Sequence, residues 1–195
     1  MRLAGWVIPG FSALALAACA TGDRADDAMA AADSSHPGTA AVSTLAPPRV
    51  SADVRDAQGR TRARATAEAA GDSLRVRIEA VGMSPGAYGA HLHAIGRCDA
   101  PGFESAGPHW NPTGQMHGKD NPKGMHKGDL PNLIVGTDGR GSFEYTIPNA
   151  ALSGMTPTSL IDGDGAAVVI HALPDDFRTD PSGKSGARIA CGVLG

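Results

Sequence analysis

Hydrophobic and polar positions alternate with a period of two along much of the chain, and helical periodicity is weak throughout. The clearest case is residues 74–80, where apolar side chains alternate with arginine and glutamate. Because successive side chains of a strand point to opposite faces, this pattern predicts strands with one buried face. Eight segments are strand candidates: 50–55, 61–68, 74–80, 87–93, 133–136, 142–147, 166–172 and 187–190.

Turn signals separate several of these segments, as at Gln58-Gly59, Gly71-Asp72 and Asp138-Gly139. Eight strands, with 26 glycines and 14 prolines in the chain, predict an all-β fold, an eight-stranded antiparallel sandwich or Greek-key β-barrel. Two segments, 95–131 and 174–186, are polar and rich in glycine and proline. Loops of this length in a compact domain are usually functional.

The first 18 residues have the features of a secretion signal. Arg2 precedes an apolar run, residues 6–18, that is too short to span a bilayer comfortably. The run ends in Leu16-Ala17-Ala18-Cys19, which resembles the lipobox of bacterial lipoproteins. The resemblance implies cleavage before Cys19 and a diacylglycerol on its thiol, made a stable anchor by a second acyl chain. The alternative is an ordinary signal peptide with an incidental cysteine.

Residues 20–48 are rich in small and polar residues and have no apolar period, which predicts a flexible linker. We therefore expect a lipoprotein signal peptide (1–18), a lipidated cysteine with its linker (19–48) and one folded domain (49–195). The lipid on Cys19 implies an anchor at the periplasmic face of a bacterial membrane. An aspartate directly after the cysteine would favour the inner membrane. This chain has Ala20 there, which favours the outer membrane.

Charge and cysteine usage narrow the class of the folded domain. Its 15 basic and 16 acidic side chains give a net charge of −1, which offers no support for a nucleic-acid partner. Two cysteines remain, Cys98 and Cys191, and in a compartment that permits disulfides we expect them to pair. The bond would close 93 residues, an entropic stabilisation of about 4–5 kcal/mol at most.

The histidines of the domain form a candidate metal centre. His91 and His93 lie two residues apart on a predicted strand, so both imidazoles can reach one ion. That pair alone is weak evidence, because such a pair is structural as often as not. The other candidates follow it in the long loop and on a later strand. The complete set is His91, His93, His109, His117, His126, His171 and Asp129.

Six histidines and a carboxylate exceed what one tetrahedral zinc ion needs, so two metal ions are the economical interpretation. Imidazole suits zinc and copper, and a site made only of nitrogen donors favours copper. A site with a carboxylate in a closed loop suits zinc. His36 lies alone in the linker and is left out of the set.

Six ordered motifs connect these residues to a known family. They are Gly89-Ala-His91-Leu-His93, Ser105-Ala-Gly-Pro-His109-Trp-Asn-Pro112, His117-Gly118, His126-Lys-Gly-Asp129-Leu-Pro-Asn132, Val168-Val-Ile-His171 and Gly186-Ala-Arg188-Ile-Ala-Cys191-Gly192. Together they resemble the copper/zinc superoxide dismutase family in its bacterial periplasmic form, over essentially all of residues 49–195. The two long segments then correspond to the family's metal-binding and electrostatic loops.

By position, the resemblance implies one copper and one zinc ion per subunit. The copper ligands would be His91, His93, His109 and His171; the zinc ligands would be His109, His117, His126 and Asp129. Asp175 would accept hydrogen bonds from one histidine of each ion, or else be an exposed loop charge. Arg188 would lie beside the copper, or else be a surface arginine. The family's disulfide corresponds to Cys98 and Cys191.

The activity implied is that of an oxidoreductase that converts superoxide to dioxygen and hydrogen peroxide by redox cycling of copper. His109, as a zinc-bound bridge, would move the proton, Arg188 would hold the anion, and Lys184 would steer it. The alternative is a non-catalytic copper-binding or copper-delivery module, but such relatives typically lack a ligand or the arginine. A zinc hydrolase is less favoured, since no His-Glu-x-x-His occurs. A monomer and a homodimer both remain open.

Overall fold

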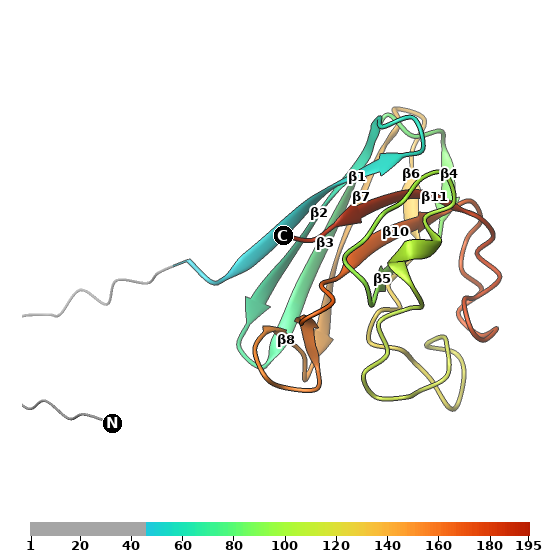
Figure 1. The fold of residues 1–195 in the computed structure, drawn as a ribbon. Helices are drawn as coiled ribbons and strands as arrows, with labels where there is room; N and C mark the ends of the chain where they lie inside the picture. The colour runs from blue at the N-terminus through green and yellow to red at the C-terminus, as the bar shows by residue number, and fades with distance from the viewer. Residues whose placement is uncertain (1–45) are drawn as a thin grey trace, which may run out of the picture. The chain divides into compact units, whose positions relative to one another are not determined.

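Strands make up almost all the regular structure of residues 46–195, the part of the chain that this computed structural model describes (Figure 1). The predicted signal peptide, Cys19 and the linker up to residue 45 lie outside the described residues. No helix in residues 46–195 is long and apolar enough to cross a membrane. The strands are β1 (Arg49–Asp56), β2 (Thr61–Ala70), β3 (Ser73–Val81), β4 (Gly86–Tyr88), β5 (Ala90–His93), β6 (Leu133–Val135), β7 (Arg140–Pro148), β8 (Ala151–Ser153), β9 (Ser159–Ile161), β10 (Ala167–His171) and β11 (Arg188–Val193).

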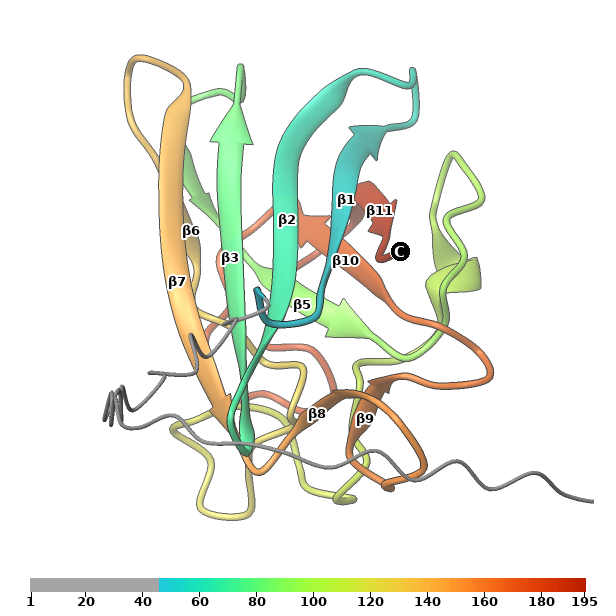
Figure 2. The same ribbon diagram turned by 90° about the vertical axis from the view of Figure 1, so that its left-hand side faces the viewer.

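Seven of these strands form one antiparallel sheet in the order β5-β10-β11-β1-β2-β3-β7. In β3, Leu74, Val76 and Ile78 are fully buried whereas the residues between them are exposed, because alternate side chains leave a strand on opposite faces. Figure 2 shows β1, β2, β3 and β7 side by side, with β5, β10 and β11 behind them. The sheet therefore curls around a core to which both halves contribute.

A second, two-stranded ladder closes the barrel. β4 pairs with β6, and in the chain β4 leads into β5 at one edge of the large sheet while β6 leads into β7 at the other edge. The β4–β6 pair thus bridges the two edges. The pairing of β3 with β7 and of β1 with β11 joins strands distant in sequence, as in a Greek-key barrel. The predicted all-β Greek-key fold is confirmed.

Each of the eight predicted segments contains a strand, with two departures. The segment 87–93 is divided at Gly89 because the chain there stops pairing with β6 and begins to pair with β10. A Cβ at Gly89 would lie 2.7 Å from the Ser185 hydroxyl oxygen, so this crossing requires glycine. The sequence also failed to predict β8 and β9, two three-residue strands that pair in parallel.

The two segments that do not fit the strand pattern are long loops. Their regular structure is limited to one 3-10 helix, Glu104–Ala106, in the first loop. We refer to residues 95–131 as the first long loop and to residues 174–186 as the second long loop. The first long loop and the ends of β5 and β10 carry the predicted metal ligands, and the second long loop carries Asp175.

Candidate metal centre

His91 and His93 lie on β5, an edge strand of the large sheet, and both side chains are fully buried. The first long loop runs along the free edge of β5. The Leu92 N–H donates to the Gly128 carbonyl (2.9 Å), and the Leu92 carbonyl accepts the Trp110 N–H (2.8 Å). A Cβ at Gly128 would collide with the Leu92 carbonyl, so this close approach needs glycine.

This edge pairing places loop residues directly beside strand residues. Isolated β-bridges pair His91 with Asp129 and His93 with His109. The third strand histidine, His171, ends β10 just after a register shift between Ile170 and His171. Residues that are widely separated in sequence therefore meet at one end of the barrel.

Four histidines form what we call the four-histidine group: His91, His93, His109 and His171. Their candidate ligand atoms all lie within 4.8 Å of one another. Those atoms are His91 Nδ1 and the Nε2 atoms of the other three, which within residues 46–195 are the only buried side-chain nitrogen or oxygen atoms without a hydrogen-bond partner. A buried polar atom without a partner costs about 1–3 kcal/mol, so four of them facing one point fit a bound metal ion.

Backbone carbonyls hold two of these rings in place. His93 Nδ1 lies 2.8 Å from the Gly107 oxygen and His171 Nδ1 lies 3.2 Å from the Gly186 oxygen. A carbonyl oxygen only accepts, so Nδ1 carries the proton in both rings and Nε2 presents its lone pair. Metal ligation requires this neutral form, and burial lowers the pKa of His91 to about 3, that of His171 to about 4 and that of His93 well below its usual value.

The second cluster, which we call the carboxylate group, consists of His109, His117, His126 and Asp129. Asp129 Oδ1 lies 2.9, 3.0 and 3.2 Å from the Nδ1 atoms of His109, His117 and His126. Ligands bonded to a tetrahedral zinc ion at 2.0–2.1 Å lie about 3.3 Å apart, so these separations fit a zinc site. The other oxygen, Oδ2, accepts the N–H groups of Gly118 and His126 and so turns Oδ1 toward the rings.

His109 belongs to both groups. Its Nδ1 faces Asp129, whereas its Nε2 is one of the unpartnered nitrogens of the four-histidine group. Burial lowers the pKa of His109 despite the hydrogen bond to Asp129. One imidazole can therefore contribute a nitrogen to each of two ions, as the resemblance implies.

Asp175 links the two groups from behind. Its Oδ2 accepts a hydrogen bond from His91 Nε2 (2.7 Å), and its Oδ1 lies 3.0 Å from His117 Nε2. The residue is 4 % exposed, so the alternative of an exposed loop charge is wrong. Burial would raise the pKa of this carboxyl, but hydrogen bonds from His117 and His91 hold it below its usual range.

Hydrogen bonding also governs protonation in the carboxylate group. Burial alone would lower the pKa of His117, but its hydrogen bonds to Asp129 and Asp175 raise that pKa to about 9. Burial likewise opposes ionisation of Asp129, whereas hydrogen bonds from His109, His117 and His126 hold its pKa far below the usual range. In the carboxylate group, the negative charge of Asp129 is thus balanced by hydrogen bonds from the three histidines.

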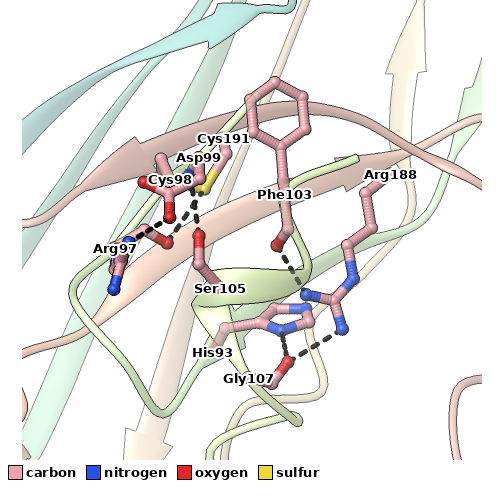
Figure 3. The surroundings of a disulfide bond; sticks show 9 residues. All are labelled: His93, Arg97, Cys98, Asp99, Phe103, Ser105, Gly107, Arg188 and Cys191. Atoms are coloured by element: carbon pink, nitrogen blue, oxygen red, sulfur yellow. Dashed lines mark hydrogen bonds and ion pairs between the residues drawn. A yellow bond between two sulfur atoms is a disulfide. The ribbon is translucent and has the colours of Figure 1, made fainter. Parts of the chain in front are cut away.

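Arg188, on β11, reaches the first long loop (Figure 3). Its Nη1 donates to the Phe103 carbonyl and its Nη2 to the Gly107 carbonyl, each at 2.8 Å. Gly107 O also accepts from His93 Nδ1, so one carbonyl aligns both the arginine and a candidate copper ligand. Two such hydrogen bonds show that Arg188 is not a free surface arginine.

The predicted disulfide is present between Cys98 and Cys191, with Cα atoms 5.6 Å apart. It joins the start of the first long loop to β11, three residues after Arg188. Figure 3 shows two links between β11 and the first long loop: the disulfide, and the hydrogen bonds from Arg188. The disulfide therefore ties the strand that carries Arg188 to the loop that carries Phe103 and Gly107.

A cavity of about 950 Å³ opens in front of the four-histidine group. His93, His109, His171 and Arg188 line it, together with Trp110, which is also part of the core. Lys184, the candidate for steering, is not among the lining residues; its ammonium lies 4.0 Å from Asp176 and its side chain is 75 % exposed. The structure thus gives Lys184 no place on the cavity wall.

Several residues that contribute to this centre could not be predicted from the sequence. The carbonyls of Phe103, Gly107 and Gly186 orient Arg188 and two histidines, but a carbonyl leaves no signal in a sequence. Asp180 accepts the His117 N–H at 2.7 Å and also lines the cavity. Its place in the proline-containing second loop gave no reason to single it out.

A Greek-key barrel whose two histidine-rich groups share one imidazole defines a class of β-barrel protein with donor sets for two metal ions. The model of the family described as copper/zinc superoxide dismutase matches residues 57–194. The chain therefore belongs to the copper/zinc superoxide dismutase family.

Individual relatives support this membership. The chain is 45% identical over 124 residues to the superoxide dismutase-like protein YojM of Bacillus subtilis, covering 63% of each chain, so it spans less than two thirds of that relative. It is 38% identical over 143 residues to a copper/zinc superoxide dismutase of Caulobacter vibrioides, covering 72% of this chain and 82% of the relative. A double mutant of a SOD-like protein from Bacillus subtilis superposes with a TM-score of 0.70 at 40% identity, over 74% of this chain and 95% of that one.

Proposed function

We propose that the protein is a superoxide dismutase that binds copper at the four-histidine group and zinc at the carboxylate group. The observation that carries this proposal is the set of four buried histidine nitrogens without partners, all within 4.8 Å of one another. When bound, copper supplies the one-electron oxidation and reduction of superoxide, whereas zinc is redox-inert and shapes the site.

The chain itself supplies an anion holder and a proton carrier. Arg188 lines the cavity beside His93, and its guanidinium keeps its place through the Phe103 and Gly107 carbonyls. A superoxide anion held there by a charge-assisted hydrogen bond lies close to the four-histidine group. Disproportionation consumes two protons for each pair of superoxide ions, and His109 Nε2 faces the same cavity while its Nδ1 is held at Asp129. We assign proton transfer to that nitrogen.

A non-catalytic copper-binding module is the second candidate, because relatives among those compared are named superoxide dismutase-like. The features that favour catalysis are present here: all four histidine donors converge, and Arg188 reaches the cavity. A module that only stores copper has no need for an arginine fixed beside the ion.

The proposed function is tested with the metal-loaded full-length chain by metal analysis and direct measurement of superoxide decay. We expect one copper and one zinc per chain in the wild type, and loss of copper and of at least about 10³-fold in rate in His171→Ala, because the ion loses a donor. His36→Ala is the matched control, since His36 lies outside the set. A fully active His171→Ala protein would refute the copper assignment, and a copper-loaded but inactive wild type would favour the non-catalytic module.

We further propose that Cys19 carries a lipid that anchors the protein at the periplasmic face of a bacterial membrane, with the outer membrane preferred. The lipobox-like residues Leu16-Ala17-Ala18-Cys19 support this proposal. Cell fractionation after expression with a labelled fatty acid tests it: the wild type should be labelled and membrane-bound, and Cys19→Ala unlabelled. Equal labelling of both proteins would contradict the anchor.

A further inference from the structure

The cavity in front of the four-histidine group is walled by more negative than positive side chains. Glu104 comes from the 3-10 helix of the first long loop, Asp162 directly follows β9, and Asp180 lies in the second long loop. The only lysine or arginine among the lining residues is Arg188. We call Glu104, Asp162 and Asp180 the acidic mouth.

Three lysines of the two long loops have their ammonium groups engaged away from the cavity wall. The Lys127 ammonium donates to the Pro148 carbonyl, that of Lys119 lies beside Asp120 and over the Phe177 ring, and Lys184 lies near Asp176. None of them lines the cavity. Among lysine, arginine, aspartate and glutamate, the cavity wall therefore carries three carboxylates and one guanidinium.

An independent observation identifies what this field would attract. The cavity is also lined by His93, His109 and His171, whose Nε2 atoms are buried and have no hydrogen-bond partner. Behind them lie the buried carboxylates Asp129 and Asp175. Unprotonated imidazole nitrogens at the inner end of an acidic entrance are complementary to a metal cation.

We propose that the acidic mouth accelerates the entry of metal cations into the four-histidine group and slows the approach of superoxide. The acidic mouth thus promotes metal binding, whereas Arg188, inside the cavity, holds the superoxide anion. The second half of this inference rests on the proposed dismutase function, whereas the first half does not. Charge of one sign around a cleft changes association rates by about 10- to 10³-fold at low salt.

The physical reason for this division is that charge at the centre changes on loading. Before loading, the acidic mouth and the two buried carboxylates attract divalent ions. Bound cations are then the largest local charges in such a site and reverse the field close to the histidines. Glu104 and Asp162 line the cavity but belong to neither ligand group, so the acidic mouth continues to repel anions at the entrance. The acidic mouth therefore speeds metal loading, which happens once, and slows the approach of every superoxide ion.

The first test measures the rate of copper uptake by the metal-free full-length chain, with cupric sulfate as the probe. Of the two tryptophans, Trp110 lines the cavity, whereas Trp6 lies in the predicted signal peptide and is replaced as Trp6→Phe in any chain that retains it. The quenching of Trp110 fluorescence then reports entry. We expect uptake by a Glu104→Gln, Asp162→Asn, Asp180→Asn triple variant to be about tenfold slower at about 10 mM ionic strength. The two rates should converge at about 0.5 M salt, where the Debye length falls below about 5 Å.

The matched control removes three negative charges from the outer face of the barrel, as Glu68→Gln, Glu79→Gln and Glu144→Gln. These glutamates lie on β2, β3 and β7 and pair only with surface arginines, and such pairs contribute little to stability. The control should load copper at the wild-type rate. Equal slowing in the control, or wild-type uptake by the triple variant, would overturn the proposal.

Asp180 also accepts the His117 N–H, so the double variant Glu104→Gln with Asp162→Asn separates field from loop structure. We expect it to retain about two thirds of the logarithmic effect of the triple variant, since it removes two of the three charges. In the metal-loaded proteins, the superoxide decay rate should rise with salt in the wild type and be severalfold higher in the triple variant. A wild-type rate that falls with salt would overturn the superoxide half, whereas an inactive wild type would refute only the proposed function.

Discussion

The four-histidine group and the carboxylate group share one residue and yet satisfy their polar atoms in opposite ways. In the carboxylate group, Asp129 Oδ1 lies within hydrogen-bond distance of three ring nitrogens. In the four-histidine group, the ring nitrogens that face one another have no partner at all. One group is internally compensated before a metal arrives, and the other is not.

The difference shows where each group obtains its geometry. The carboxylate group is held by contacts among its own members. The four-histidine group is held from outside, by the Gly107 and Gly186 carbonyls and by Asp175. Damage to the two carbonyl supports should therefore affect copper binding first, whereas damage to Asp129 should affect folding as well as zinc binding.

The largest effect is expected from removal of the disulfide. Replacing Cys98 and Cys191 by alanine should lower the free energy of unfolding of the metal-free chain by about 3 kcal/mol, because the unfolded chain loses a 93-residue constraint. The same change loosens the loop that carries Gly107, so copper content should fall more than zinc content. Urea unfolding and metal analysis measure the two outcomes. Equal loss of both metals would contradict external support of the four-histidine group.

Asp129→Asn should destabilise the metal-free chain almost as much, by about 3 kcal/mol, because it leaves buried histidines without their counter-charge. Zinc binding should be lost in the same variant. Asp164→Asn is the control, since Asp164 is exposed in a turn. If the urea midpoint of the Asp129→Asn protein matched that of the control, the carboxylate group could not be internally compensated.

Asp175→Asn tests the link between the two groups. Residues that orient metal ligands typically change affinity by about 10- to 100-fold, and Asp175 contacts one histidine of each group. Chelator competition should show a loss of this size for both metals. The adjacent, exposed Asp176 provides the control as Asp176→Asn. A loss of affinity for only one metal would contradict the role of Asp175 in both groups.

The smallest change is expected from Arg188→Lys, which should lower the superoxide decay rate by about tenfold and leave metal content unchanged. A lysine cannot donate to the Phe103 and Gly107 carbonyls in the fork that the guanidinium uses. The control is Arg97→Lys, since Arg97 is an exposed arginine of the first long loop. Loss of copper from the Arg188→Lys protein would instead show that Arg188 supports the four-histidine group.

The regular strands could be predicted because their burial follows directly from the sequence. In β3 the alternation of apolar and charged residues is complete, and no tertiary contact overrides it. The break between β4 and β5 could not be predicted, since it depends on where Gly89 meets the second long loop. β8 and β9 are too short for any periodicity to be visible.

The candidate ligands were predictable because their residue types are rare and their order matches a family. The structure brings all seven together. The supports of these ligands were not predictable, because Gly107 and Gly186 act through backbone oxygens. The acidic mouth was missed for a related reason: its three carboxylates come from three separate segments, and only the folded chain places them around one cavity.

The position of His109 in both groups makes the two binding equilibria interdependent. An ion held at Nδ1 fixes the rotation of the ring and so removes part of the entropic cost of binding a second ion at Nε2. Thermodynamic linkage is reciprocal: whatever factor zinc adds to the affinity for copper, copper adds to the affinity for zinc, typically about 5- to 150-fold. A shortage of either metal would therefore lower the occupancy of both sites.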